Sequence, residues 1–253
     1  MIKSLAFFFY FFSIATIFGQ TGSEVNIIRT VSALSTDSMK VRSVGSSGER
    51  NANKFIRKNW GDGKRTSFYS WEYDIVDGAD TIKSEMVGSF LYNKAKATIL
   101  IGAPLENTAD VALFLALQHE LSQLKLDVNV MLVAVTSKDN GHQGLDYLAT
   151  HMPKKARDIR LLIDLDGIGS MNIEKPELYV KATAGIFQEL QSMIKQFELV
   201  EEDVQLLNQS DAKNYFNRGV QCLSISNKNE EDSINTNGIL QVKDFLVQWI
   251  QIK

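Results

Sequence analysis

The sequence predicts an α/β fold in which a mostly parallel, mixed sheet is covered by helices on both faces. From residue 98 onward, short and continuously apolar segments alternate with helical segments, a pattern typical of strands buried on both sides. Upstream, residues 67–75 and 86–92 alternate polar and apolar side chains, and Asp77-Gly78 lies between them. This pattern predicts an antiparallel hairpin, so we expect a mixed sheet.

Apolar periodicity and turn residues predict the order of the other elements. Residues 45–48 read as a loop, and the helix after it places Ala52, Phe55 and Ile56 on one face. Beyond the hairpin, the expected strands are 98–102, 128–135, 159–165, 178–182 and 220–225. The expected helices are 25–34, 49–60, 109–124, 145–151, 186–197 and 239–252.

The first 19 residues have the layout of a secretory signal peptide. Lys3 supplies positive charge, residues 5–18 are almost entirely apolar, and the small residue Gly19 precedes the expected cut. A membrane anchor is the alternative, but a span needs about 20 apolar residues and this run is shorter. We therefore expect residues 1–19 to be removed and residues 20–253 to form a single domain. The product should be exported, periplasmic or secreted, with no stable membrane span.

Composition excludes some partners and constrains the chain's redox chemistry. A net charge of −3 without a block of Lys and Arg argues against a nucleic-acid partner. Cys222 is the only cysteine, so no internal disulfide can form. Its neighbours Val220, Leu223 and Ile225 predict a buried strand thiol. No Gly-x-Ser-x-Gly motif is present, and no histidine lies near Cys222 in sequence, so nucleophilic catalysis is not indicated.

Small and polar residues follow several predicted strands, at the positions where such sheets form their ligand sites. The segments read GAPLENTAD at 102–110, TSKDNGHQG at 136–144, DLDGIG at 164–169 and SDAKNYFNRGV at 210–220. Because the carboxyl ends of parallel strands meet at one edge of a sheet, we expect these four segments to lie close together.

In this order the four segments resemble the motifs of the co-catalytic zinc exopeptidases. That family includes bacterial leucyl aminopeptidase, glutaminyl cyclases and the transferrin receptor ectodomain. Its strands end in Gly-Ala-His-x-Asp, Ser-Gly-Glu-Glu-x-Gly and Asn-x-Asp-x-x-Gly, and Ser-Asp-His precedes a further strand. The likeness extends over about residues 31–250 and includes the Gly-Ser-x-Gly-Glu stretch that ends at Glu49. It implies a zinc-exopeptidase-like, phosphorylase/hydrolase-type fold.

The resemblance implies two zinc ions held by two histidines, two aspartates and a glutamate, with a second glutamate as general base. Here the two histidine positions hold Pro104 and Ala212, neither of which has a donor side chain. Asp166 keeps one aspartate ligand. Asp110 falls at the bridging aspartate, although the loop before it is shorter than in the family.

The other family positions differ as well. Lys138 replaces the general base, Asp139 replaces the neighbouring glutamate ligand, and Glu106 replaces the aspartate that orients the first histidine. A catalytic zinc ordinarily keeps three protein ligands, and a lysine ammonium would repel a metal. The resemblance therefore implies a degenerate member, a pseudoenzyme with no catalytic residue and no zinc cofactor.

Two alternatives for the site remain open. His142 lies on the same segment as Asp139, so Asp139, His142 and Asp166 could form a relocated zinc site. The chain would then be an active metallo-aminopeptidase that hydrolyses N-terminal peptide bonds. Otherwise, the Lys138 ammonium either neutralises Asp139 and Asp166 in place of zinc or points into solvent. His119 and His151 lie on predicted helices, where we expect structural or solvated roles.

The expected function is that of a non-catalytic binding or assembly protein with a peptide or protein partner. A remaining cleft would be lined by Glu106, Asp110, Lys138, Asp139, His142, Asp166 and Asp211. A third possibility is a scaffold protein whose cleft is closed and whose partners bind an outer surface. The presence or absence of an open cleft above Asp166 distinguishes the first from the third.

Overall fold

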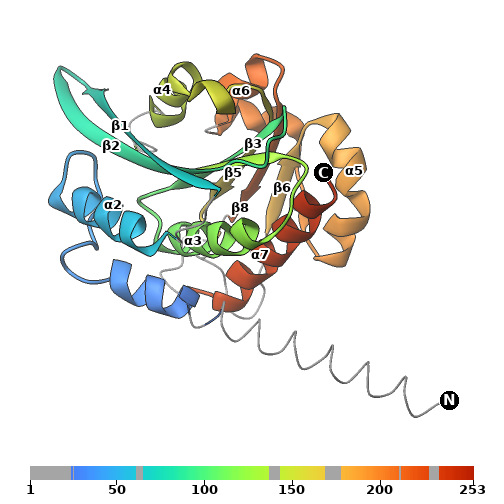
Figure 1. Ribbon diagram of the computed structural model, residues 1–253, viewed down its shortest axis with the longest axis horizontal. Coiled ribbons are helices and arrows are strands. Elements are labelled where there is room, and N and C mark those ends of the chain that lie inside the picture. Colours follow the sequence, from blue (N-terminus) through green and yellow to red (C-terminus); the bar gives the residue numbers. More distant parts are fainter. Residues whose placement is uncertain are drawn as a thin grey trace, which may run out of the picture.

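The computed structural model describes residues 24, 26–60, 65–136, 143–168, 178–210, 212–227 and 234–253, and it confirms the α/β class (Figure 1). Within these residues, eight strands form one sheet in the order β1-β2-β4-β3-β5-β8-β6-β7. The strands are β1 (Thr66–Asp77), β2 (Asp80–Leu91), β3 (Thr98–Pro104), β4 (Asn129–Val135), β5 (Ile159–Asp166), β6 (Tyr179–Ala182), β7 (Val200–Glu201) and β8 (Gln221–Ser226).

The sheet is mixed, as the sequence predicts. β3 pairs in parallel with β4 and β5, β5 with β8, and β6 with β7. The pairs β1–β2, β2–β4 and β6–β8 are antiparallel. The carboxyl ends of β3, β4, β5 and β8 therefore lie along one edge of the sheet, where the topology favours a ligand site.

Helices cover both faces of this sheet. A larger buried cluster contains apolar side chains from residues 26–34 and from α2 (Ser47–Asn59), α3 (Thr108–Gln123), α5 (Ala184–Gln196) and α7 (Thr236–Gln251). A second cluster contains those of α4 (Gln143–His151) and α6 (Lys213–Asn217). Figure 1 shows α3 and α7 on the side of the sheet opposite α4 and α6. Successive side chains of the central strands point alternately into the two clusters, which explains the continuous apolar sequences of these strands.

β3 is longer than the sequence predicts, because it continues past residue 102 to Pro104. Proline is tolerated there for a reason visible in the strand pairing. The Leu105 amide donates to the Val135 carbonyl at 2.7 Å, so the nitrogen of Pro104 faces the opposite side, toward β5. Pairing between β3 and β5 ends at Gly102, so the missing N–H of Pro104 removes no ladder bond.

Several short elements were not predicted from the sequence. They are β7, α6 and the 3₁₀ turns Lys154–Ala156 and Val204–Gln209. Such elements are too short to show an apolar period, so periodicity could not reveal them. Among the described residues, none of the helices combines the length and the hydropathy that a membrane span requires.

Candidate functional site

The carboxyl edge of the central strands carries two of the family positions. Pro104 ends β3 opposite Val135, the last residue of β4. Asp166 ends β5 beside Ser226, the last residue of β8. Asp166 is half-buried, whereas Pro104 is buried. The predicted gathering of strand-end segments is therefore confirmed for these two strands.

Asp110 connects α3 to the chain that follows Asp166. The N-cap residue Asn107 accepts hydrogen bonds from the amides of Ala109 and Asp110, which fixes the start of the helix. The Asp110 side chain is fully buried. Its two carboxylate oxygens accept the N–H groups of Gly167 and Ile168, each at 2.7 Å. The structure thus brings Asp110 close to the Asp166 segment and gives each carboxylate oxygen a backbone donor.

Arg42 holds the segment between β3 and α3, and sequence reasoning missed it. Only 4% of this residue is exposed. Its guanidinium donates, over 2.6–3.0 Å, to the carbonyls of Leu34, Met39, Leu105 and Glu106 and to the Thr108 hydroxyl. Burial lowers the pKa of Arg42, and the charge of Glu106 opposes that shift. The only sequence signal for this residue is its place just before the Gly-Ser-x-Gly-Glu stretch.

A buried chain of hydroxyl groups leads from that stretch to the end of β4. The Thr136 hydroxyl, directly after β4, lies 2.5 Å from the Tyr73 hydroxyl and 2.8 Å from the Ser84 hydroxyl. Ser84 in turn donates to the Glu49 carboxylate, whose other oxygen accepts from the Gly45 amide at 2.6 Å. The network anchors the residue that immediately precedes residues 137–142, and its members were not recognised from the sequence.

Ala212 occupies an apolar environment. It has no exposed surface, and it belongs to the cluster that contains Leu145, Leu162 and Tyr215. The Tyr215 hydroxyl donates to the Leu145 carbonyl at 3.4 Å, and the Asn214 amide donates to the Asp146 carboxylate. These contacts hold α6 against α4, and Ala212 directly precedes α6.

Cys222 is a buried strand thiol, as predicted. Burial, with a smaller contribution from Asp164, raises its pKa to about 12. Asp164 itself is buried on β5 and accepts the Ser224 hydroxyl at 3.3 Å. A thiol with so high a pKa is almost fully protonated near neutral pH, so Cys222 is a poor nucleophile.

The remaining predicted site residues divide into two groups. His119 and His151 are exposed on α3 and α4, and the His151 ring stacks on Tyr147 with 3.8 Å between centroids. Their expected structural or solvated roles are confirmed. The other four, Lys138, Asp139, His142 and Asp211, lie outside the described residues. The position of the Lys138 ammonium relative to Asp139 and Asp166 therefore stays a prediction.

A sequence model of peptidase family M28 matches residues 105–238, which is more than half of the chain. The chain belongs to peptidase family M28. The matched range begins directly after Pro104 and contains the positions of Asp110, Asp166 and Ala212. It also contains Lys138 and Asp139.

Solved structures with the same fold include aminopeptidases and glutaminyl cyclases. The LapA aminopeptidase of Legionella pneumophila aligns with a TM-score of 0.71 at 11% identity, covering 90% of this chain and 72% of LapA. A glutaminyl cyclase of Fimbriiglobus ruber gives 0.73 at 13% identity, covering 91% and 95%. A zinc aminopeptidase of Bacillus subtilis gives 0.69 at 11% identity, covering 91% and 96%. At these identities the likeness concerns the fold alone. None of the curated proteins compared with the chain matches it.

M28 membership implies zinc, but the described residues do not fit a two-zinc centre. Pro104 and Ala212 offer no donor atom, and Ala212 lies among apolar side chains. Each Asp110 oxygen already accepts a backbone N–H. In the part of the chain that the structure describes, which leaves out residues 137–142 and 211, no three His, Cys, Asp or Glu side chains form a group that could hold a metal. Of the described family ligand positions, Asp110 and Asp166 keep a carboxylate, but no histidine stands at the other two, and zinc sites favour imidazole ligands.

Proposed function

We propose that this M28 chain is a non-catalytic member of its family and acts by binding rather than by hydrolysing peptide bonds. The observation that carries the proposal is Ala212. It stands where the resemblance places a histidine ligand, and its fully buried methyl group belongs to the apolar cluster that also contains Leu145, Leu162 and Tyr215. A larger, metal-binding side chain at this buried position would disturb the packing of that cluster.

Two further positions support the proposal. Pro104 occupies the other histidine position, and its ring has no atom that can coordinate a metal. Lys138 occupies the position of the general base, which would otherwise contribute roughly 10²–10⁴ in rate. With both histidines and the base replaced, we expect neither a zinc cofactor nor turnover, and a peptide or protein as partner.

The alternative is an active metallo-aminopeptidase with a rearranged zinc site. Asp166 favours it, because this carboxylate remains half-buried at the end of β5, where the topology favours a ligand site. Asp139 and His142 would supply the other ligands. This alternative makes a specific prediction, namely that zinc binding depends on His142.

A zinc titration by calorimetry, started from metal-free protein, distinguishes the two functions. We expect no binding at micromolar zinc, no release of N-terminal amino acids from peptides, and no cyclisation of N-terminal glutamine. Binding at a stoichiometry of one or two, lost in His142→Ala and retained in His119→Ala, would support the alternative instead. His119 is the matched control because it is an exposed histidine on the outer side of α3.

We also infer export of the chain from the layout of residues 1–19. Mass spectrometry of the protein recovered outside the cytoplasm should show an N-terminus near residue 20. A full-length chain retained in the membrane fraction would contradict cleavage and support an anchor.

A further inference from the structure

The outer edge of β1 is a long stretch of exposed backbone at one end of the sheet. β1 is the first strand in the sheet order, and β2 lies between it and β4. It pairs with β2 without interruption from Thr66 opposite Leu91 to Asp77 opposite Asp80. Its other side has no neighbouring strand among the described residues. Such an edge can pair with an additional strand.

The hydrogen bonds of the hairpin show which groups face outward. The Arg65 carbonyl accepts the Tyr92 amide at 2.9 Å, so odd-numbered residues of β1 direct their backbone groups toward β2. Even-numbered residues direct theirs outward. Val76 agrees with this alternation, because its N–H and C=O both bond the side-chain amide of Gln143, at 3.0 and 2.9 Å. The Gln143 side-chain amide thus makes the two backbone hydrogen bonds at Val76 that a neighbouring strand would otherwise make.

Before Val76, the outward backbone groups of β1 make few contacts with the part of the chain that the structure describes. From Phe68 to Asp74, the described residues offer the outward backbone groups one contact, the Tyr147 hydroxyl on the Glu72 carbonyl at 3.4 Å. That distance is long for a hydroxyl donor, so the bond is weak. The edge can therefore accept a partner strand over this stretch without losing a strong internal bond.

One face of β1 is apolar and the other carries carboxylates, and this difference indicates which kind of strand would pair with its edge. Trp71, Tyr73 and Ile75 turn toward the second buried cluster, whereas Glu72 and Asp74 point to the opposite, exposed face. On that face Asp74 forms a solvent-exposed ion pair with Lys83 of β2 at 3.1 Å, and such exposed pairs are weak. The strand reads TSFYSWEYDIVD and contains no lysine or arginine. A second copy of this edge would bring carboxylates against carboxylates, which is unfavourable in paired strands. A strand with basic residues on one face would instead meet opposite charges.

We propose that the edge of β1 from Phe68 to Asp74 binds an extended basic segment of another polypeptide as an added strand. Main-chain hydrogen bonds to the outward groups would provide affinity. The alternating side chains of the bound segment would provide specificity. Its lysine or arginine residues would lie on the same face of the sheet as Glu72 and Asp74. Its apolar residues would lie on the same face as Trp71 and Tyr73. The inference rests on the described backbone groups of β1 and not on whether the chain binds zinc.

The test uses a synthetic peptide of about seven residues in which lysine alternates with valine, measured against purified protein by fluorescence anisotropy at low salt. Two peptide controls accompany it, one with glutamate in place of lysine and one methylated on the alternate backbone nitrogens that would face β1. We expect saturable binding that both controls weaken by about tenfold or more, since each loses either the charge pairing or the ladder bonds.

Variants on the protein test the same edge. Ser70→Pro removes an outward N–H but no bond to β2, a position where edge strands tolerate proline. Ser70→Ala is the matched control, because it removes the same hydroxyl contacts with Arg57 and Glu85 and keeps the N–H. We expect Ser70→Pro to weaken binding by about tenfold and Ser70→Ala by less than about twofold. If Ser70→Pro does not fold, the methylated peptide makes the same comparison on the unaltered protein.

Three outcomes would overturn the inference. They are the absence of binding to the basic peptide, equal binding of the methylated peptide, and equal binding of the glutamate peptide. Self-association of the protein that Ser70→Pro abolishes would also overturn it, because the occupant of the edge would then be a second copy of the chain.

Discussion

At the residue scale, Ala212 stands where the resemblance places a metal ligand, and the structure buries it in the apolar core. A histidine there would have to place its imidazole in the buried apolar cluster that contains Leu145 and Tyr215. A larger side chain in a filled core costs about 1–3 kcal/mol, and an imidazole without hydrogen-bond partners costs more.

Substituting Ala212→His should therefore lower the free energy of unfolding by about 2–4 kcal/mol. Lys213→His is the matched control, because it places the same side chain one residue later at an exposed position. Urea unfolding followed by circular dichroism measures both variants. Equal stability of the two would show that residue 212 is not packed as described.

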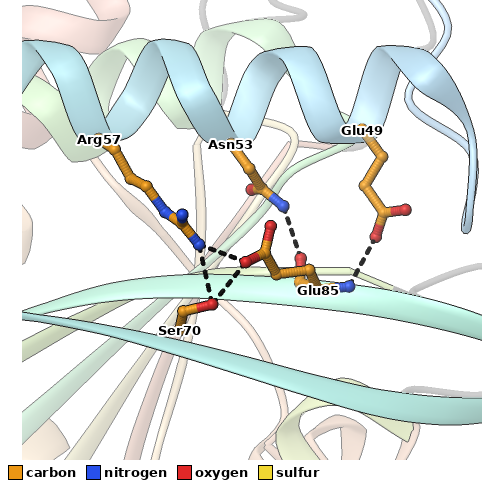
Figure 2. Close-up of polar contacts among 5 residues, drawn as sticks. All are labelled: Glu49, Asn53, Arg57, Ser70 and Glu85. Atoms are coloured by element: carbon orange, nitrogen blue, oxygen red, sulfur yellow. Dashed lines mark hydrogen bonds and ion pairs between the residues drawn. The ribbon is translucent and has the colours of Figure 1, made fainter.

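At the scale of an element, α2 carries a polar face that docks it on the β1–β2 hairpin. Figure 2 shows Glu49, Asn53 and Arg57 pointing from one side of the helix toward the hairpin. Glu49 accepts the Glu85 amide at 3.2 Å, and the Asn53 side chain donates to the Glu85 carbonyl at 2.7 Å. Arg57 contacts the Glu85 carboxylate. The inner two residues are buried, whereas the Arg57 side chain is 43% exposed.

This gradient of burial predicts unequal effects along α2. Glu49→Gln places an amide where a carboxylate now accepts from Gly45, Ser84 and Glu85, and it should lower the free energy of unfolding by about 1–3 kcal/mol. Arg57→Gln removes a partly exposed ion pair and should cost less than about 1 kcal/mol. Chemical denaturation measures both. If Arg57→Gln lowered the free energy of unfolding more than Glu49→Gln does, the buried end of the interface would not be the part that stabilises it most.

At the scale of the whole molecule, the second buried cluster contains two groups that burial keeps protonated, Tyr215 and Cys222. Burial raises the pKa of the Cys222 thiol to about 12 and also raises the pKa of the Tyr215 phenol. Both groups keep their protons in the folded state at pH values where the unfolded chain releases them, because the unfolded pKa values are near 9.0 and 10.0. Their contribution to stability is complete below about pH 9 and decreases as the pH rises from there.

Unfolding midpoints measured between about pH 8 and about pH 11 should therefore decline with rising pH. Cys222→Ala should remove the part of the decline that begins near the thiol's unfolded pKa of 9.0, and Tyr215→Phe the part that begins near 10.0. A decline that is the same in both variants as in the unaltered protein would assign it to other groups. For each variant, the decline is measured relative to its own unfolding midpoint near pH 8.

Much of the fold could be predicted because its elements leave periodic patterns. α2, α3, α5 and α7 were located to within a few residues, and so were β1 and the central strands, whereas β2 begins at Asp80, well before the predicted residue 86. Each buries one face or both, so apolar spacing identifies it. α6 and β7 left no such pattern, and Arg42 gave no hint of its buried role. A guanidinium that bonds carbonyls from several segments is indistinguishable in sequence from a surface arginine.

The sequence alone determined the α/β class, the resemblance to co-catalytic zinc exopeptidases and the absence of histidine at positions 104 and 212, because these follow from residue types and their order along the chain. Tertiary structure decided that Asp110 accepts the amides of Gly167 and Ile168, that Glu49 is connected through Ser84 to Thr136, and that β1 is the first strand of the sheet formed by the described residues. These facts depend on which distant segments meet. Contacts between such segments are set by packing and strand order, and local sequence spacing does not encode them.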